Sequence, residues 1–279
     1  MTSDVKSQNT LSEKMTTKVK VTFLGTGSAF AKTLWNTSIL VEWGEGESYC
    51  NLLLDCGGST GRALHSARRS FEQIQNVFIS HCHGDHMDGL DELGFMGRFA
   101  YKRKARLFAA EGVYREIRDA LTPKMRALHN ERREPIQMNI EDYFDVSLCS
   151  DSCWLGAKRL VVSQDYHSHI VGKPCSHVGL QDSNGKGILW YSGDRIFDRD
   201  LITEAAANYW LLLHECQLWD GAPGPVHTFL GELLTLPEEV QRKILLVHYG
   251  DNWREFEGRT GQMRFARQGE SIDFALWNA

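Results

Sequence analysis

Three histidines and one aspartate crowd into six residues directly after a short apolar run, and this density constrains the chain more than any other feature. The segment is His81-Cys82-His83-Gly84-Asp85-His86, and it follows Val77-Phe78-Ile79. Side chains two apart on an extended segment point the same way, so His81 and His83 can grip one ion. The glycine permits a sharp turn that carries Asp85 and His86 toward a second position. Because imidazole and carboxylate suit a cation such as Zn²⁺, the segment predicts half of a two-metal site. A His-rich surface loop is the alternative.

Two later segments also place a possible ligand at the end of an apolar strand. Asp194 closes the run Ile188–Gly193, and His248 follows Ile244–Val247. Each has a plainer reading, because a Gly-Asp pair often forms an ordinary turn and a histidine can be buried for structural reasons. Their order behind the first motif favours the metal-binding interpretation.

The pattern His-x-His-x-Asp-His after a short strand resembles the metallo-β-lactamase superfamily, and its glycine is closer to the phosphodiesterase and tRNase Z-like branch. The segments 21–29, 36–38 and 52–57 follow in the order of that branch, so the resemblance covers the chain from about Lys18 onward. The carboxyl-terminal segments 226–228, 232–237 and 246–251 are similar to the anti-Pycsar cyclic nucleotide phosphodiesterases within it.

The resemblance implies a set of site residues. Asp194 would bridge two metals, and the third imidazole of the first metal would be His169, with His167 as the main rival and His177 in a packing or substrate-side role. Glu215 would orient His227 as the general acid, although a helix-terminal hydrogen bond and a core histidine would explain the same pair. Asp85 would ligate one metal and orient the nucleophile. The metal ligands expected on this basis are His81, His83, Asp85, His86, His169, Asp194 and His248.

The function implied is hydrolysis of 3′,5′-cyclic mononucleotides, cyclic CMP and UMP and also cyclic AMP and GMP, by a homodimer with two divalent ions. Zn²⁺ is the expected metal and Mn²⁺ the second choice, and phage evasion of a Pycsar defence is the implied role. Alternatives are a tRNase Z-like RNA 3′-endonuclease, a non-catalytic nucleotide-binding module, and a hydrolase of small esters. Between Gly112 and Gly156 the chain has no glycine, so we expect no tRNA-binding arm. The net charge of −5 also disfavours a large polyanion. No substrate-binding residue is assigned.

Composition indicates a cytoplasmic enzyme rather than a membrane protein. No apolar run approaches the roughly 18 residues of a membrane span, and the first residues lack a signal core. Seven scattered cysteines favour a reducing compartment. Cys149 and Cys153 are expected to be free thiols, with a second zinc site as the alternative.

Alternating strand and helix patterns predict an α/β fold, the αββα sandwich of the metallo-β-lactamase fold. Residues 1–17 are expected to form a flexible extension and residues 18–279 a single hydrolase domain. Helices are predicted over 61–74, 88–100 and 113–128, the last bent or interrupted at Pro123. A further helix is expected to open at 225–228. Strands are predicted at 18–24, 38–43, 49–54, 77–79, 160–162, 178–181, 187–191, 209–213 and 244–247.

Overall fold

The computed structural model describes residues 18–219 and 226–275. The predicted extension at 1–17 therefore lies outside the described residues. Within them, no helix has both the length and the apolar character needed to cross a bilayer.

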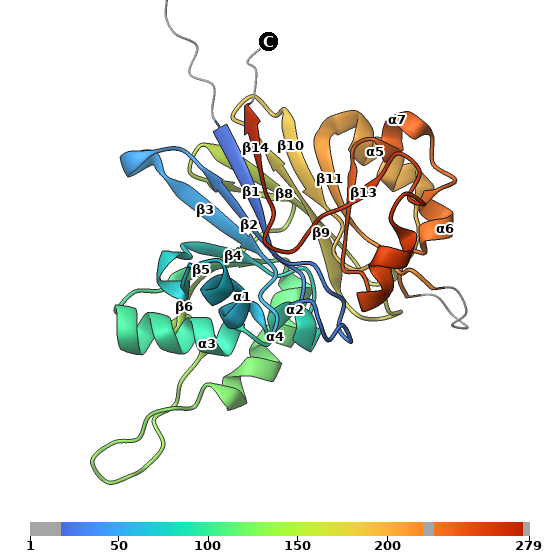
Figure 1. Cartoon of the computed structure of the whole chain (residues 1–279). Helices are drawn as coiled ribbons and strands as arrows, with labels where there is room; N and C mark the ends of the chain where they lie inside the picture. The colour runs from blue at the N-terminus through green and yellow to red at the C-terminus, as the bar shows by residue number, and fades with distance from the viewer. Residues whose placement is uncertain (1–17, 220–225, 276–279) are drawn as a thin grey trace, which may run out of the picture.

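Two mixed sheets of seven strands each pack face to face among the described residues (Figure 1). The first runs in the order β14 (Ser271–Ala275), β1 (Lys18–Gly25), β2 (Ser38–Trp43), β3 (Cys50–Leu54), β4 (Asn76–Phe78), β5 (Ala105–Ala109) and β6 (Phe144–Leu148). The second runs β13 (Arg264–Phe265), β12 (Ile244–Val247), β11 (Tyr209–Glu215), β10 (Gly187–Tyr191), β9 (Cys175–Gln181), β8 (Lys158–Asp165) and β7 (Ser152–Leu155).

Helices cover the outer faces of both sheets, so the predicted αββα sandwich is confirmed (Figure 1). The first sheet carries α1 (Thr60–Ser66), α2 (Gly84–Met87), α3 (Leu90–Phe95) and α4 (Glu111–Lys124). The second carries α5 (Arg199–Asn208), α6 (Leu230–Leu233) and α7 (Glu238–Gln241). The 3-10 helices are η1 (Gly46–Ser48), η2 (Phe71–Gln73), η4 (Ile140–Asp142) and η5 (Asp251–Phe256), and η3 (Met96–Tyr101) is a π-helix.

The central strands are apolar runs because both of their faces are covered. Every residue of β2, β10 and β12 is buried, as expected for strands between a helical layer and a second sheet. One apolar cluster joins residues of the two sheets, and a second lies between the second sheet and its helices.

Strand direction brings the candidate ligands to one edge of the sandwich. Strands β10, β11 and β12 run parallel to one another, and so do β3, β4 and β5. The carboxyl ends of parallel strands meet at the same edge, so residues that follow these strands gather there even when they are far apart in sequence.

The predicted helices differ from the observed ones where the backbone leaves helical geometry. The helix expected over 61–74 ends at Ser66, because Arg68 takes a left-handed φ of 56°. Beside it, Arg69 pairs with both carboxylate oxygens of Glu42 at 2.9 and 3.0 Å. The helix expected over 113–128 contains Pro123 without interruption but ends directly after it, at Lys124. The helix expected at 225–228 begins later, at Leu230. Strands β5, β6, β7, β13 and β14 were not predicted.

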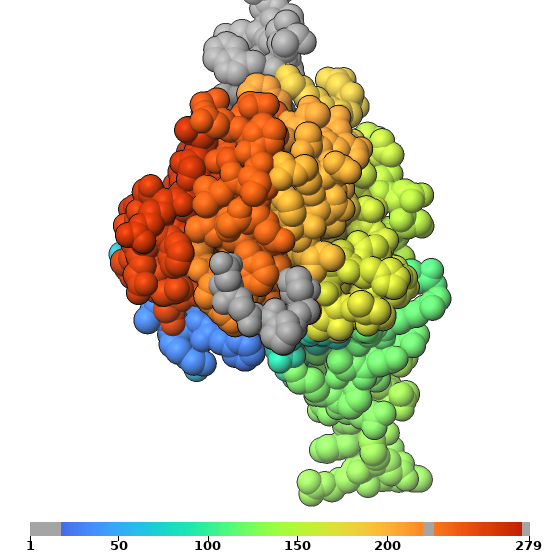
Figure 2. Space-filling view, turned by 90° about the vertical axis from the view of Figure 1, so that its right-hand side faces the viewer, coloured from blue at the N-terminus to red at the C-terminus, as the bar shows by residue number. Residues whose placement is uncertain are grey.

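The loop between α4 and η4, residues 125–139, projects away from the sandwich (Figures 1 and 2). The region thus carries a projecting loop, although one without glycine, and the expected absence of a tRNA-binding arm stays a prediction. A turn without glycine is possible here because the Asn130 side chain accepts hydrogen bonds from the Arg132 and Glu134 amides, each at 2.9 Å. Arg133 supplies the left-handed backbone conformation, with φ 61°.

Two of the cysteines form a disulfide, which overturns the expectation that they are free thiols. Cys149 and Cys153 flank the turn from β6 to β7, where the chain passes from one sheet to the other. The turn brings their Cα atoms to 5.8 Å, a separation that a disulfide spans. The other five cysteines are free thiols.

Replacing Phe23 with alanine should test the inter-sheet core. Phe23 is fully buried in β1, so Phe23→Ala should lower the free energy of unfolding by about 3–5 kcal/mol. Trp154→Ala is the control, because this side chain is 59% exposed, and it should change that energy by less than about 0.5 kcal/mol. Equal losses in urea unfolding would contradict the assigned core.

Candidate metal centre

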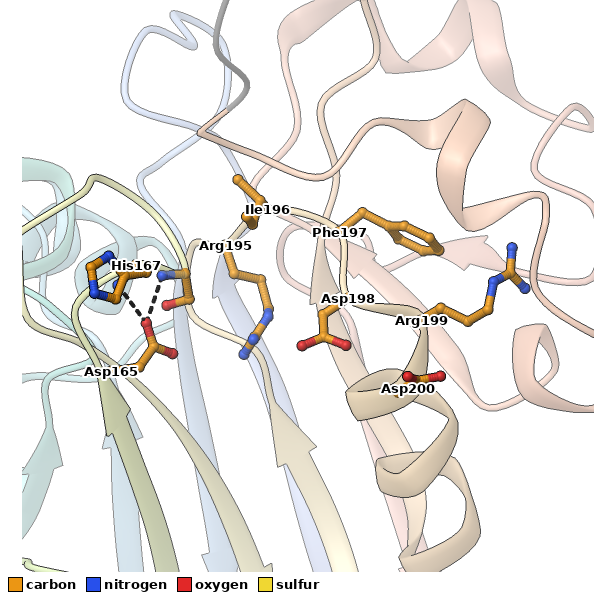
Figure 3. A pocket seen from close by; sticks show the side chains of 9 residues that line it. Asp165, His167, Arg195, Ile196, Phe197, Asp198, Arg199 and Asp200 are labelled. Atoms are coloured by element: carbon orange, nitrogen blue, oxygen red, sulfur yellow. Dashed lines mark hydrogen bonds between the residues drawn. The ribbon is translucent and has the colours of Figure 1, made fainter.

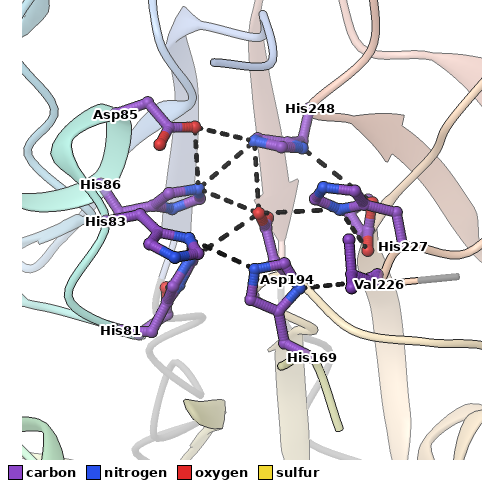
Figure 4. Close-up of polar contacts among 12 residues, drawn as sticks. His81, His83, Asp85, His86, His169, Asp194, Val226, His227 and His248 are labelled. Atoms are coloured by element: carbon purple, nitrogen blue, oxygen red, sulfur yellow. Dashed lines mark hydrogen bonds and ion pairs between the residues drawn. The ribbon is translucent and has the colours of Figure 1, made fainter. Parts of the chain in front are cut away.

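Residues from both sheets meet in a compact polar cluster at the edge where the parallel strands end (Figure 4). One side of the cluster comes from the turn after β4, which runs through His81 into α2. The other side comes from the segments that follow β8, β10, β11 and β12. At the interior of this cluster, His81, His86 and Asp194 are buried.

Three imidazoles form the first group of possible ligands. His81 Nε2 lies 2.9 Å from His83 Nδ1, and His169 Nε2 lies 3.2 Å from that same atom. One nitrogen from each of the three side chains falls within 4.8 Å of the others. Three nitrogens that converge on one point form the donor set of a Zn²⁺-type ion with a further position open.

Asp85, His86, Asp194 and His248 form the second group. His248 Nε2 lies 3.1 Å from Asp85 Oδ2 and 3.3 Å from His86 Nε2. Asp85 Oδ2 also lies 3.2 Å from His86 Nε2. Two carboxylates and two imidazoles therefore point at a common position beside the first group.

Asp194 lies between the two groups. Its Oδ2 is 3.8 Å from His81 Nε2 in the first group and 3.3 Å from His86 Nε2 in the second (Figure 4). Its Oδ1 is buried and has no hydrogen-bond partner among the described residues. A buried carboxylate oxygen without a partner is costly unless a cation satisfies it.

The charge states of these groups fit a cation. Burial lowers the pKa of His81, so this imidazole is neutral and its lone pair is available to a metal. Burial alone would raise the pKa of Asp194, but the imidazoles of His248 and His86 outweigh it and lower that pKa well below its usual range. The residues present therefore fit divalent metal binding on their own chemistry.

The buried carboxylate of Asp55, which was not among the residues predicted for the site, contacts the nitrogen of His86 that faces away from the ligand group. Asp55 Oδ2 lies 2.8 Å from His86 Nδ1 and accepts the Tyr191 hydroxyl at 2.7 Å. The backbone amide and hydroxyl of Ser80 donate to the same carboxylate. Such a partner fixes which imidazole nitrogen faces the metal. The signal was present, since Asp55 follows the apolar strand β3 just as His248 follows β12.

Glu215 and His227 form a pair beside the second group. Nδ1 of His227 lies 3.1 Å from both oxygens of Glu215, and Glu215 Oε1 also accepts the amides of Arg195 at 2.8 Å and Thr228 at 3.2 Å. Burial alone would lower the pKa of His227, but the Glu215 carboxylate outweighs it and raises the pKa to about 9. The geometry gives an oriented imidazole next to the metal-binding groups, and its raised pKa favours the protonated form.

The structure brings His169 rather than its rival His167 to the first group. His169 is held by the Val226 carbonyl oxygen, 2.5 Å from its Nδ1. His167 is exposed and lies with Asp165 and Arg195 along a separate pocket, where its amide donates to Asp165 Oδ1 at 2.9 Å (Figure 3). His177, expected in a packing or substrate-side role, lies 3.1 Å from the Arg195 guanidinium, and His214 is fully buried.

Known proteins match this chain closely in sequence. The family model for "Anti-Pycsar protein Apyc1" matches residues 19–272. The Anti-Pycsar protein Apyc1 of Bacillus phage vB_BsuM-Goe3 is 38% identical over 91% of this chain and 97% of its own length. The protein of that name from Paenibacillus sp. (strain J14) is 36% identical over 90% of this chain and 98% of its own length.

Solved structures share the fold at low identity. The metallo-β-lactamase fold protein YhfI from Bacillus subtilis is 19% identical with a TM-score of 0.67, over 92% of this chain and all of that one. Human tRNase Z, short form, is 19% identical with a TM-score of 0.62, over 91% and 98%. Unliganded yeast PDE1 is 13% identical with a TM-score of 0.65, over 92% and 99%.

The sandwich, with its histidine and aspartate groups at one edge, therefore has the metallo-β-lactamase fold, and the protein belongs to the anti-Pycsar Apyc1 family.

Proposed function

We propose that this protein is a dinuclear metal-dependent phosphodiesterase that opens 3′,5′-cyclic mononucleotides to linear monophosphates. The observation that carries the proposal is the Glu215–His227 pair beside two adjoining groups of metal ligands. Cyclic CMP and cyclic UMP are the first substrates to test, followed by cyclic AMP and cyclic GMP. Since the relatives are named anti-Pycsar proteins and several come from Bacillus phages, we also propose a role in evading a Pycsar defence.

The two groups around Asp194 would each hold one ion. His81, His83 and His169 would bind the first, Asp85, His86 and His248 the second, with Asp194 shared. The nitrogen-rich donor set favours Zn²⁺, with Mn²⁺ as the second choice. When bound, such ions lower the pKa of water and stabilise charge on phosphate oxygens.

His227 would supply the proton to the leaving ribose oxygen. Its Nδ1 faces Glu215, which leaves Nε2 for the substrate. In the reaction, a bond forms from a water oxygen to phosphorus, the bond from phosphorus to the ribose oxygen breaks, and the proton lost by that water passes to solvent. The proton of His227 passes to that oxygen and gives the ribose hydroxyl, while Asp85 would help to orient the attacking oxygen.

Glu215 is better suited to orient His227 than to bind a metal, although it also lies within 4.8 Å of the ligand atoms of Asp194 and His248. Its Oε1 already accepts two backbone amides, and both oxygens face His227. A protein that only sequesters nucleotides would gain nothing from a buried carboxylate aimed at an imidazole. The pair therefore favours catalysis over passive binding.

A small substrate also suits the surface better than RNA does. The projecting loop carries three arginines and two glutamates, so its net charge is only +1. Binding a polyanion such as RNA requires an excess of positive charge on the protein. The whole chain instead has a net charge of −5, which disfavours such binding. The tRNase Z-like activity is therefore the second candidate, supported by the shared fold alone.

Turnover of cyclic CMP, UMP, AMP and GMP by the purified, metal-loaded protein tests the proposal, with a precursor tRNA assayed beside them. We expect conversion to linear monophosphates. His227→Ala should lower kcat by about 10²- to 10⁴-fold with unchanged metal content, because it removes the proton donor. Processing of the tRNA alone, or full turnover by the variant, would overturn the assignment.

Metal content of two matched variants tests the choice of the third imidazole. His169→Ala should lose metal from the first group, since it removes one of three converging nitrogens. His167→Ala should keep the metal content of the wild-type protein, because that side chain lies at a separate pocket. The metal content is measured by elemental analysis after dialysis. Loss of metal from His167→Ala but not from His169→Ala would show that the assignment is wrong.

We further propose that the enzyme acts in the cytoplasm as a homodimer. The exposed apolar side chains of Met96, Phe99 and Ile136, near and on the projecting loop, supply surface that a second copy could cover. Light scattering of the purified protein should give twice the chain mass of 31.7 kDa. A mass equal to one chain at micromolar concentration would contradict the dimer.

A further inference from the structure

A cavity of about 630 Å³ opens beside the proposed general acid. Its inner end is formed by His227, His248 and Glu215, and its outer walls carry the aromatic side chains of Phe30 and Trp219. Pockets for small ligands measure roughly 300–1,000 Å³, so this space suits a molecule of mononucleotide size. Because His227 would lie at the scissile phosphate, this cavity adjoins the position where the rest of the nucleotide would bind.

Two large aromatic side chains at the cavity are open to solvent. Phe30 is 86% exposed, and Trp219 is 59% exposed. They come from segments far apart in the chain, the turn after β1 and the segment after β11. Exposed rings at the mouth of a pocket offer flat faces on which a planar heterocycle can stack.

The turn that carries Phe30 is fixed although its tip is exposed. Asp251 accepts the Lys32 amide at 2.7 Å and the amide and hydroxyl of Thr33 at 3.0 and 2.6 Å. Gly27 lets the turn close, because a Cβ atom there would lie 2.7 Å from Leu34 Cβ. A turn that is already ordered loses little conformational entropy when a ligand binds to it.

The charge of the cavity wall limits which chemical class of ligand the cavity can bind. Among the described residues that line it there is no lysine or arginine, and Asp251 adds a negative charge. A second phosphate, as in a longer nucleotide chain, would find no cationic partner here. The side-chain amides of Gln217 and Asn252 can instead donate to and accept from the edge of an uncharged base.

We propose that this cavity is the nucleobase subsite, in which Phe30 and Trp219 stack the heterocycle of the cyclic nucleotide. The inference rests on the proposed function and deepens it by assigning substrate-binding residues. Every base has a π-face, so stacking binds purines and pyrimidines alike. Hydrogen bonds from the side-chain amides of Gln217 and Asn252 would then make the affinity differ between bases.

Steady-state kinetics of Phe30→Ala and Trp219→Ala on the four cyclic nucleotides test the subsite. KM should rise by roughly 5- to 150-fold in each variant, with a smaller change in kcat, because stacking holds the base and not the reacting atoms. Phe30→Tyr should restore KM, whereas Phe30→Leu should not, since leucine is apolar without a ring. Trp154→Ala, which removes an equally exposed tryptophan on β7, is the matched control and should leave KM unchanged.

Two further readouts separate this inference from the proposed function. The cyclic phosphate of propane-1,3-diol has neither a base nor an aromatic ring, so the ratio of kcat/KM for a cyclic nucleotide to that for this diester should fall in Phe30→Ala. An unchanged ratio and unchanged KM in both alanine variants would overturn the subsite even if the wild-type protein hydrolyses cyclic nucleotides.

If the wild-type protein hydrolyses no cyclic nucleotide, the proposed function is wrong, but the subsite can still be tested. The test is then the binding of CMP and AMP, measured by calorimetry. Binding that weakens in Phe30→Ala and not in Trp154→Ala would then support a base subsite. Absence of binding, or equal binding by both variants, would overturn it.

Discussion

The crowding of imidazoles and carboxylates around Asp194 is the constraint on which the rest of the structure depends. His81, His86 and Asp194 are buried together, and one oxygen of Asp194 has no partner among the described residues. Burying such groups without compensation is unfavourable, and a divalent cation compensates several of them at once. Metal binding therefore accounts for an arrangement that folding alone would disfavour.

The two sheets maintain this crowding by different means. The first sheet delivers a continuous motif, in which the turn after β4 carries four ligand candidates and Asp55 fixes one of them from behind. The second sheet delivers single residues from the ends of parallel strands. Because the centre forms only where the sheets meet, the inter-sheet core and the chemistry of the site are linked. The imidazole of His227, oriented by Glu215, would add the proposed proton transfer to a cation-binding site.

The gathering of the candidate ligands could be predicted from the sequence because most of them follow a strand, while their binding of metal stays a prediction. The gathering of His81 with His83 and the strand-end positions of Asp194 and His248 needed only local patterns. Contacts between distant segments could not be read in this way. The role of Asp55 depends on Tyr191, which is remote in sequence. The end of α1 depends on the left-handed conformation of Arg68, and the projecting loop depends on a turn that lacks glycine. The turn that carries Phe30 depends on hydrogen bonds to Asp251, which lies near the other end of the chain.

Anomalous X-ray scattering from crystals of the metal-loaded protein, measured on both sides of the zinc and manganese absorption edges, tests the central claim most directly. The account predicts two anomalous peaks, one among His81, His83 and His169 and one among Asp85, His86 and His248, with Asp194 between them. A single peak, or peaks elsewhere with this cluster holding only water, would contradict a two-metal centre and remove the basis of the proposed phosphodiesterase.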